Sequence, residues 1–488
     1  MEFRLTFGEL FGALKEAGLV IRHSHMPRGQ KSAVIRFKAK EVRNGDVFLC
    51  YEGAHFDSHT LISQAVSQGA SLIILDRASY VPFCQVPYVL VESSRAAWAV
   101  LMALGYGEPQ KSLKVVGVTG TNGKTSTAFY VRELLRIMGE PCLFLGTIGG
   151  YLGEEFFEIS HTTPDPPKLY ESFARAVELG IKYVVMEVSS IALHQRKLEP
   201  VVFEASCFTS FSRDHLDYHK SMGAYLAAKL SLMSRRKTLS MCLMHKDVYE
   251  YVENDAGADG FELGHVEVYG DNYEVSPSSD GLGSQFSYGG GSGFVPVLGD
   301  YAADNFAAAL MLVEGVLGRR VATADWSLVS GVPGRLEALD CHGQILVDYA
   351  HTPDALAKTL SLVKSRVVGA SRLWVVFGCG GDRDVGKRPL MAEAAALYGD
   401  EVIVTSDNPR NEEPEKIIAD VVAGFKEGQS YRVEVDRREA IRQGIFAMGA
   451  LDWLVIAGKG HESYQEVSGK KWPFSDREVA REAWNDRE

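Results

Sequence analysis

A glycine-rich segment that ends in a lysine and two hydroxyl residues is the strongest chemical signal in this chain. Residues 119–126 read Thr-Gly-Thr-Asn-Gly-Lys-Thr-Ser. Glycines let backbone N–H groups close around phosphate oxygens, while Lys124 can reach the β- and γ-phosphates and the Thr125 hydroxyl can join a Mg²⁺ shell. Val118 stands where a usual P-loop has glycine, and Gly120 lies inside the loop instead. A strand-like run precedes the segment and a helix-like stretch follows it, so it predicts a nucleotide-phosphate site rather than a glycine turn with an incidental lysine.

Two further segments in the middle of the chain carry side chains that bind metals. Glu187 follows the apolar run Tyr183–Met186, and an acid at a strand tip beside a P-loop is placed to bind Mg²⁺. Taken alone, Glu187 is equally well interpreted as a solvent-exposed loop carboxylate. Residues 212–219 read Ser-Arg-Asp-His-Leu-Asp-Tyr-His, but their spacing fits no zinc pattern. From residue types alone, this segment is a polar loop.

Loops in the last third of the chain hold residues that suit a small zwitterion. Asp407–Arg410 and Gly458–Glu462 each follow an apolar run, and Arg383 lies in the loop 380–384. Arginine binds a carboxylate in a bidentate fork, while aspartate and glutamate bind an ammonium group. We therefore predict an amino-acid site; the competing interpretation is a set of solvated charges that stabilise turns.

The elements that must position these residues fall into three blocks. The first, to about residue 110, has short β-type runs at 47–50, 71–75 and 88–91 separated by helix-like stretches such as 60–68, which predicts a small α/β domain. The second has continuous apolar runs, typical of parallel strands covered on both faces. Its Ser/Gly-rich residues 276–294 are expected to form surface turns or hairpins.

The third block repeats one pattern four times, an apolar strand followed by a polar or glycine-rich loop. The predicted strands are Ile345–Val347, Leu373–Phe377, Val402–Val404 and Trp453–Ile456. In open parallel sheets the ligand lies beyond the carboxyl ends of the strands. The four loops are therefore expected to share one rim.

Composition excludes several other classes of protein. The chain has 488 residues and a formal net charge of −12, which argues against nonspecific nucleic-acid binding. No apolar run reaches the ~18 residues of a membrane helix, and residues 1–6 carry no secretory pattern. The cysteines lack the spacing of a disulfide framework or a zinc site, which favours a reducing cytoplasm. They are Cys50, Cys84, Cys142, Cys207, Cys242, Cys341 and Cys379.

Together the motifs resemble the Mur ligases, the ATP-dependent amide ligases of peptidoglycan precursor synthesis. The resemblance rests on residues 119–126, 187–190, 214–217 with 225–229, 334–335 and 348–356. The loops 407–410 and 458–462 look like those of the type that adds meso-diaminopimelate. The resemblance implies three α/β domains: a UDP-substrate-binding domain over 1–110, a central ATP-binding domain with a mainly parallel sheet over 111–334, and a Rossmann-like amino-acid-binding domain over 335–488.

The resemblance also implies a reaction and its participants. ATP would phosphorylate the free side-chain carboxylate of D-glutamate in UDP-MurNAc-L-Ala-D-Glu, and an amine of meso-diaminopimelate would attack the acyl phosphate. The products would be an amide, ADP and phosphate. Mg²⁺ and ATP are the expected cofactors, the partners are these small molecules without nucleic acid or a membrane span, and the chain is expected to be a monomer.

Roles for individual residues follow from the resemblance alone. The implied catalytic residues are Lys124, Glu187, His215 and Lys229. The implied Mg²⁺ ligands are Thr125, Glu187, His215 and Lys229, the last as a carbamylated lysine. The implied ATP contacts are Gly120, Thr121, Asn122, Gly123, Lys124, Thr125, Ser126, Asn305, Arg335 and Asp348, the last at the ribose. The muramoyl-dipeptide part would contact Thr162, Thr163, Ser189, Gln195 and Lys197. Diaminopimelate would contact Arg383, Asp407, Asn408, Pro409, Arg410, Gly458 and Glu462.

Some positions depart from the family pattern, and other functions stay open. Lys38-Ala39-Lys40 replaces an Asp-Ser-Arg segment, and the remaining departures are His161, Ile191, Lys197, Ser210 and Ala302. Alternatives within the class are the same ligase using L-lysine, which Arg410 disfavours, and a folylpolyglutamate synthase. Outside it are a P-loop NTPase switch without ligation and a degenerate ligase kept as a binding protein.

Overall fold

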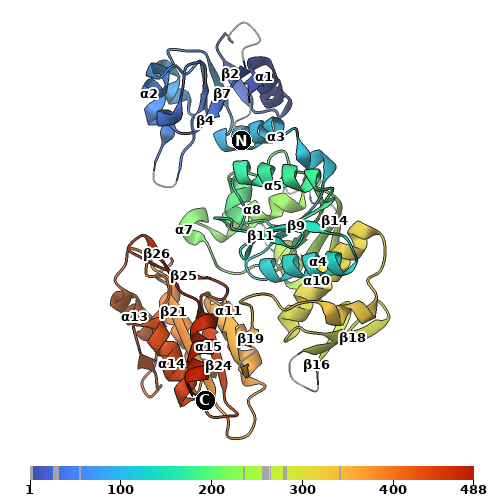
Figure 1. Cartoon of the computed structure of the whole chain (residues 1–488), viewed down its shortest axis with the longest axis vertical. Coiled ribbons are helices and arrows are strands. Elements are labelled where there is room, and N and C mark those ends of the chain that lie inside the picture. Colours follow the sequence, from blue (N-terminus) through green and yellow to red (C-terminus); the bar gives the residue numbers. More distant parts are fainter. Residues whose placement is uncertain are drawn as a thin grey trace.

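The computed structural model describes residues 4–25, 32–53, 56–234, 237–254, 263, 265–278, 283–339 and 342–487. Figure 1 shows three α/β blocks that follow one another in chain order, from the blue N-terminal block to the red C-terminal block. Cys341, the first three residues of segment 1–6 and residues 279–282 of segment 276–294 lie outside the described residues. Among the described residues, no helix is both long and apolar enough to cross a membrane.

The N-terminal block is built on a five-stranded sheet in the order β2-β7-β6-β5-β4, parallel except for β2. The strands are β2 (Val20–His23), β4 (Ile35–Arg36), β5 (Val47–Leu49), β6 (Leu72–Leu75) and β7 (Tyr88–Val91), with a separate pair β1 (Leu5–Thr6) and β3 (Ser32–Ala33). The helices are α1 (Phe7–Glu16), α2 (Ile62–Ser67) and α3 (Ser94–Gly105). The three predicted strands are confirmed, and the helix-like stretch 60–68 contains α2.

The central block has an eight-stranded sheet in the order β11-β10-β9-β12-β8-β13-β14-β15, in which β9, β12, β8, β13, β14 and β15 run parallel. The strands are β8 (Lys114–Thr119), β9 (Cys142–Gly146), β10 (Gly149–Leu152), β11 (Glu155–Phe157), β12 (Tyr183–Glu187), β13 (Phe203–Phe208), β14 (Thr238–His245) and β15 (Val266–Tyr269). The helices are α4 (Lys124–Ile137), α5 (Pro166–Glu178), α6 (Ser190–His194), α7 (Leu216–His219), α8 (Met222–Leu230), α9 (Lys246–Asn254) and α10 (Asp300–Leu317). The expected hairpins are present as an antiparallel sheet of β16 (Tyr273–Pro277), β17 (Ser284–Tyr288) and β18 (Gly291–Val295).

The C-terminal block is a six-stranded sheet in the order β19-β20-β24-β21-β22-β23, parallel except for β19. The strands are β19 (Glu337–Leu339), β20 (His342–Asp348), β21 (Leu373–Cys379), β22 (Glu401–Ser406), β23 (Arg432–Val433) and β24 (Trp453–Ala457), followed by the hairpin β25 (Tyr464–Val467) and β26 (Lys470–Pro473). The helices are α11 (Pro353–Lys364), α12 (Lys387–Tyr398), α13 (Pro414–Val422), α14 (Arg437–Ala447) and α15 (Asp476–Arg487). The four predicted strands are confirmed, and because they are parallel neighbours their carboxyl ends share one rim.

Helices cover both faces of this C-terminal sheet, which explains its continuous apolar strands. Val375 and Phe377 belong to one buried cluster with residues of α11, α12 and α13, while Trp374 and Val376 belong to another with residues of α14 and α15. Successive strand residues point to opposite faces, so a sheet buried on both faces needs apolar residues without alternation. This block therefore has a core of its own.

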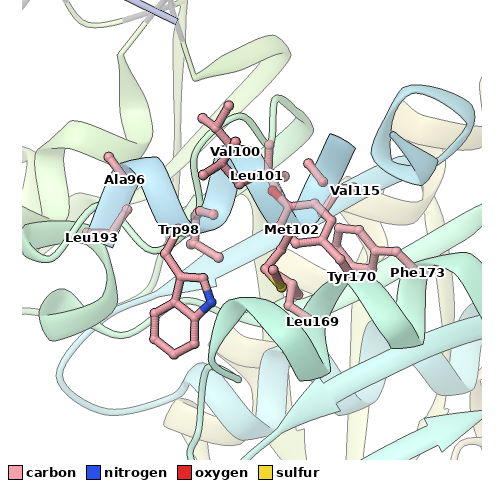
Figure 2. Packing of buried hydrophobic residues seen from close by; sticks show 14 of the residues in the cluster. Ala96, Trp98, Val100, Leu101, Met102, Val115, Leu169, Tyr170, Phe173 and Leu193 are labelled. Atoms are coloured by element: carbon pink, nitrogen blue, oxygen red, sulfur yellow. The ribbon is translucent and has the colours of Figure 1, made fainter. Parts of the chain in front are cut away.

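The N-terminal and central blocks share one hydrophobic core. Figure 2 shows Trp98, Leu101 and Met102 of α3 beside Leu169, Tyr170 and Phe173 of α5, all within a single buried cluster. Phe173 is fully buried, and its ring lies 5.8 Å from that of Tyr170 in an edge-to-face arrangement. The first two blocks are thus joined by packing as well as by the chain.

Removing the Phe173 ring is expected to destabilise the protein. The Phe173→Ala protein should lose about 3–5 kcal/mol, because the buried ring leaves a cavity where α3 meets α5. Val177→Ala, on the same helix but 38% exposed, is the control and should change stability by less than about 0.5 kcal/mol. Urea unfolding followed by circular dichroism measures both, and a similar loss in the two proteins would contradict the prediction.

Candidate active site

The glycine-rich loop joins β8 to α4. Its glycines are required by a close neighbouring side chain and by the backbone conformation. Gly120 has φ +153°, and a Cβ there would lie 2.0 Å from the Thr209 hydroxyl oxygen. Gly123, with φ +85°, precedes the first residue of α4 in the left-handed region. A side chain at either position would meet a close neighbour or strain the backbone. The loop therefore presents its backbone at the N-terminus of a helix, the usual place for an anion.

The residues that follow β13 hold this loop in shape. Thr209 donates its hydroxyl to the Asn122 carbonyl at 2.5 Å. The Ser210 carbonyl accepts from the Thr121 amide at 2.8 Å, and the Ser210 hydroxyl accepts from the Asn122 amide at 2.9 Å. Ser210 is one of the departures from the family pattern, and here it anchors the phosphate loop directly.

Two lysines, the partly buried Lys124 and the buried Lys229, converge on one carbonyl of the loop. Lys124 Nζ donates to the carbonyl oxygens of Gly120 and Thr121, both at 2.9 Å, and Lys229 Nζ of α8 donates to the same Gly120 carbonyl at 2.6 Å. Lys229 is 1% exposed, and its ammonium lies 4.6 Å from the centre of the Tyr225 ring. Burial holds the pKa of both lysines below the usual value, and for Lys229 the neighbouring charge of Lys124 lowers it further.

Glu187 and Thr125 form a compact pair of oxygen donors beside the loop. The fully buried Glu187 accepts from the Thr125 hydroxyl at 3.0 Å. It also accepts from the amide of Thr147 at 2.7 Å and from the Thr147 hydroxyl at 3.1 Å. Hydroxyl and carboxylate oxygens are ligands that suit Mg²⁺, which also keeps water and substrate phosphate in its shell. Within the described ranges no three His, Cys, Asp or Glu side chains gather as a metal cluster.

His215 lies near the ring of Tyr225. It begins α7 with φ +52°, and its ring centre is 6.1 Å from that of Tyr225, the residue whose ring also contacts Lys229. His215 Nε2 is 3.6 Å from Asp214, and the side chain is 44% exposed. Sequence reasoning from residue types had favoured a polar loop here; the fold brings the loop next to Lys229.

Three of the five residues expected to hold the dipeptide part, Thr162, Thr163 and Ser189, lie around Glu187. The Thr163 hydroxyl donates to the Glu187 carbonyl at 2.9 Å and accepts from the Ser189 amide at 2.9 Å. The Thr162 hydroxyl is 3.1 Å from that of Thr147. Gln195 ends α6, the helix that Ser189 caps. A separate ion pair joins Lys197 to Asp165 at 2.6 Å.

Three contacts bring the C-terminal block against the central block, two of them at the phosphate loop and one at Thr147. Arg335 donates to the Thr125 hydroxyl at 3.4 Å, and Asn122 donates to Asp354 at 3.3 Å. His461 Nε2 lies 3.0 Å from the Thr147 carbonyl. Because a carbonyl only accepts, that nitrogen must carry the hydrogen. The rim of the third block thus reaches the same threonine that holds Glu187.

Asp348 and Asn305, two of the expected ATP contacts, lie on different blocks and bind different parts of the chain. The 6% exposed Asp348 accepts from the Leu336 amide with one oxygen, which holds the linker between the blocks. Its other oxygen accepts from the Ala350 amide and the Thr359 hydroxyl, within the C-terminal block. Burial raises the pKa of Asp348. The Asn305 side chain accepts from the Thr127 hydroxyl at 3.1 Å, on the first turns of α4.

The predicted amino-acid rim is also assembled in space. The Asn408 amide donates to Glu462 at 2.8 Å, and a Cβ on Gly458 would lie 2.5 Å from an Asp407 oxygen. Arg410 donates to the Gly381 carbonyl at 2.7 Å. Two further residues lie in contact with these loops, the buried Pro409 against Gly381 and the exposed Arg383 beside Gly380.

Four residues of this region were missed in the sequence. Lys459 and His461 belong to a segment that was recognised, but nothing in their types distinguished them from loop residues. Thr147 and Thr209 follow strand ends, where their contacts depend on pairing across the sheet. Only the rule that ligands lie beyond the carboxyl ends of strands could have drawn attention to these two threonines.

The thermal stability of the protein should depend on the protonation of His461. Burial lowers the pKa of this imidazole to about 4. Protonation is therefore disfavoured in the fold, so stability from this group is complete above the usual pKa of about 6.5 and falls as the pH drops towards 4. We expect the melting temperature to fall less between about pH 7 and about pH 4.5 in the His461→Gln protein than in the unchanged protein. Equal falls in melting temperature in the two proteins would show that His461 contributes nothing to the pH dependence of stability.

Comparison with known proteins agrees with this arrangement. Residues 118–313 match the family model of the Mur ligase middle domain, and residues 334–460 match that of the Mur ligase glutamate ligase domain. The protein of Syntrophomonas wolfei named UDP-N-acetylmuramoyl-L-alanyl-D-glutamate--2,6-diaminopimelate ligase is 38% identical over 481 residues, which cover 95% of this chain and 97% of that protein. The protein of the same name from Aquifex aeolicus is 37% identical and covers 92% of each chain.

Solved structures show the same fold. A structure of UDP-N-acetylmuramoyl-L-alanyl-D-glutamate--2,6-diaminopimelate ligase is 29% identical, covers 99% of each chain and has a TM-score of 0.63. The MurF ligase of Thermotoga maritima, solved with ADP, is 18% identical, with 93% of this chain and 96% of that chain covered and a TM-score of 0.56. On its similarity to these relatives along nearly its full length, the chain belongs to the Mur ligase family.

Proposed function

We propose that this chain is an ATP-dependent ligase that adds meso-diaminopimelate to UDP-MurNAc-L-Ala-D-Glu in peptidoglycan precursor synthesis. ATP phosphorylates the D-glutamate side-chain carboxylate and leaves as ADP. An amine of diaminopimelate then attacks the acyl phosphate, phosphate leaves, and the amine gives up a proton as the amide forms. The observation that carries the proposal is that the third block meets the ATP site at two points. His461 of the amino-acid rim contacts the carbonyl of Thr147, the residue that holds Glu187, and Arg335 contacts Thr125 of the phosphate loop.

The phosphate loop would hold ATP, and Lys124 would stabilise the transferring phosphoryl group. Mg²⁺ would neutralise phosphate charge, with Thr125, Glu187, His215 and a carbamylated Lys229 as ligands. Lys229 supports this assignment because it is a buried cation that donates to a carbonyl beside a second cation. An unpaired buried charge is costly, whereas a carbamate is an anion that Lys124 can pair with.

The third block would select the amino acid. Arg410 and Arg383 would bind a carboxylate of diaminopimelate, and Asp407 and Glu462 an ammonium group, while Asn408, Pro409 and Gly458 shape the rim. The N-terminal block would hold the UDP part. We keep the domain limits 1–110, 111–334 and 335–488, a monomeric state and a cytoplasmic location as parts of the proposal.

Amino-acid-dependent phosphate release tests this function directly. The assay supplies ATP, Mg²⁺ and UDP-MurNAc-L-Ala-D-Glu and compares meso-diaminopimelate, L-lysine and L-ornithine. We expect release to require both the nucleotide dipeptide and an amino acid, with strong preference for diaminopimelate. ATP turnover that ignores both additions would reject the ligase and favour a nucleotide switch, and equal use of L-lysine would reject the specificity.

A further inference from the structure

Lys459 is a fully buried lysine between β24 and β25, outside the phosphate site. Its Nζ lies 3.0 Å from Asn408 Oδ1 and 2.7 Å from Glu462 Oε2, and 5.6 Å from the centre of the Tyr464 ring. Burying an ammonium group is costly unless it is paired and hydrogen-bonded. Both of its partners belong to the rim that the proposed function assigns to the amino acid.

The contacts of Lys459 determine which end of the Asn408 amide faces the ligand. Asn408 Oδ1 accepts from Lys459 Nζ and also from the Glu466 amide at 2.9 Å, so its two lone pairs are used. Two donors on one side require the oxygen to lie there. The amide nitrogen therefore faces Glu462, to which it donates one hydrogen. No other acceptor among the described residues binds this nitrogen, so its second hydrogen is left for a carboxylate.

Lys459 also gives the two oxygens of Glu462 different surroundings. The hydrogen bonds to Glu462 from Lys459 and Asn408 both fall on Oε2. Among the described residues, no hydrogen bond is made to Oε1, and the side chain is 14% exposed. One oxygen is thus fixed inside the protein while the other remains for an ammonium group.

We propose that Lys459 is a positioning residue for the amino-acid substrate, which presents one N–H of Asn408 and one oxygen of Glu462 to the carboxylate and ammonium ends of a zwitterion. This inference rests on the proposed function. Without Lys459 the two side chains lose their common partner and can rotate. The amino acid would then bind less well, while ATP binding, whose proposed contacts do not include Lys459, Asn408 or Glu462, would be unchanged.

The test compares Lys459→Met with Lys470→Met, a control at an exposed position on β26. We expect Lys459→Met to raise the KM for meso-diaminopimelate by about 10- to 100-fold, the effect of losing hydrogen bonds to charged groups. The KM for ATP should stay within about twofold, and Lys470→Met should match the unchanged protein. A merely structural role would alter both KM values together, and an unchanged KM for diaminopimelate would overturn the inference.

A second variant keeps the test decisive if Lys459→Met folds poorly. Lys459→Met combined with Glu462→Gln removes the whole ion pair and leaves no unpaired buried charge. We expect this double variant to fold, and its loss of affinity for diaminopimelate to be smaller than the two single losses combined, because the two residues act partly as one unit. Fully additive losses would overturn the inference. If the unchanged protein shows no diaminopimelate-dependent turnover, the proposed function is what has failed.

Discussion

The Arg410→Lys protein is expected to lose most of its preference for meso-diaminopimelate over L-lysine, by up to about 10⁴-fold. Diaminopimelate differs from lysine by one distal carboxylate. The Arg410 backbone is fixed by hydrogen bonds with Glu466 and Ser468, and one nitrogen of its guanidinium is held by the Gly381 carbonyl. Its Nε lies 3.5 Å from a carboxylate oxygen of Glu466. Among the described residues the other terminal nitrogen makes no hydrogen bond, so it can still pair with a carboxylate. A lysine ammonium is a single point charge and cannot make both contacts in a fixed geometry.

The ratio of kcat/KM for the two amino acids, measured by phosphate release, gives this discrimination. Arg438→Lys is a suitable control, because Arg438 is a half-exposed arginine of the same block that pairs with Glu482. It should leave the ratio unchanged. An Arg410→Lys protein that still discriminates like the unchanged one would mean that another residue recognises the distal carboxylate.

The Lys124→Met protein is expected to lose about 10²- to 10³-fold in kcat, the range found when one donor to developing negative charge is removed. The methionine side chain keeps the length and packing of lysine but not its charge. Lys124 lies at the first position of α4 with its ammonium at the phosphate loop, so the loss should fall on the phosphoryl transfer and not on the folding of the site.

Single-turnover formation of ADP is the appropriate measurement for Lys124→Met. Lys114→Met is the matched control, since Lys114 begins β8, the strand that leads into the phosphate loop, and donates to the carbonyl of Val316 away from the loop. A raised KM for ATP with an unchanged kcat would show that Lys124 binds the nucleotide without assisting the reaction.

Much of the fold could be predicted because it depends on local patterns. Unbroken apolar runs such as 373–377 are required wherever both faces of a parallel sheet are covered, and these runs were found as strands. Within the C-terminal block, strands β19, β23, β25 and β26 were not predicted. They are short, lie at sheet edges or in a separate hairpin, and are held mainly by pairing with neighbours, so their own residues carry little pattern.

Site residues could be predicted where the local backbone conformation itself requires a particular residue type. They could not be predicted where their role depends on contacts with residues far away in the sequence. Gly120 and Gly123 are recognisable because the loop geometry itself requires glycine. Lys229 reaches the Gly120 carbonyl across 109 residues, and on sequence alone it looks like a lysine on a helix surface. Only the resemblance to a family pointed to it. Lys459 carried no signal, because its burial results from how two loops meet.

The joint core of the first two blocks has a consequence for any attempt to cut the chain into pieces. A fragment that begins after α3 would expose Leu169, Tyr170 and Phe173 to water, and such an exposed apolar patch promotes aggregation. A fragment that begins near Gly334 keeps helices over both faces of its sheet. We therefore expect the C-terminal block to fold when it is expressed alone. The N-terminal and central blocks should be expressed together, as one fragment.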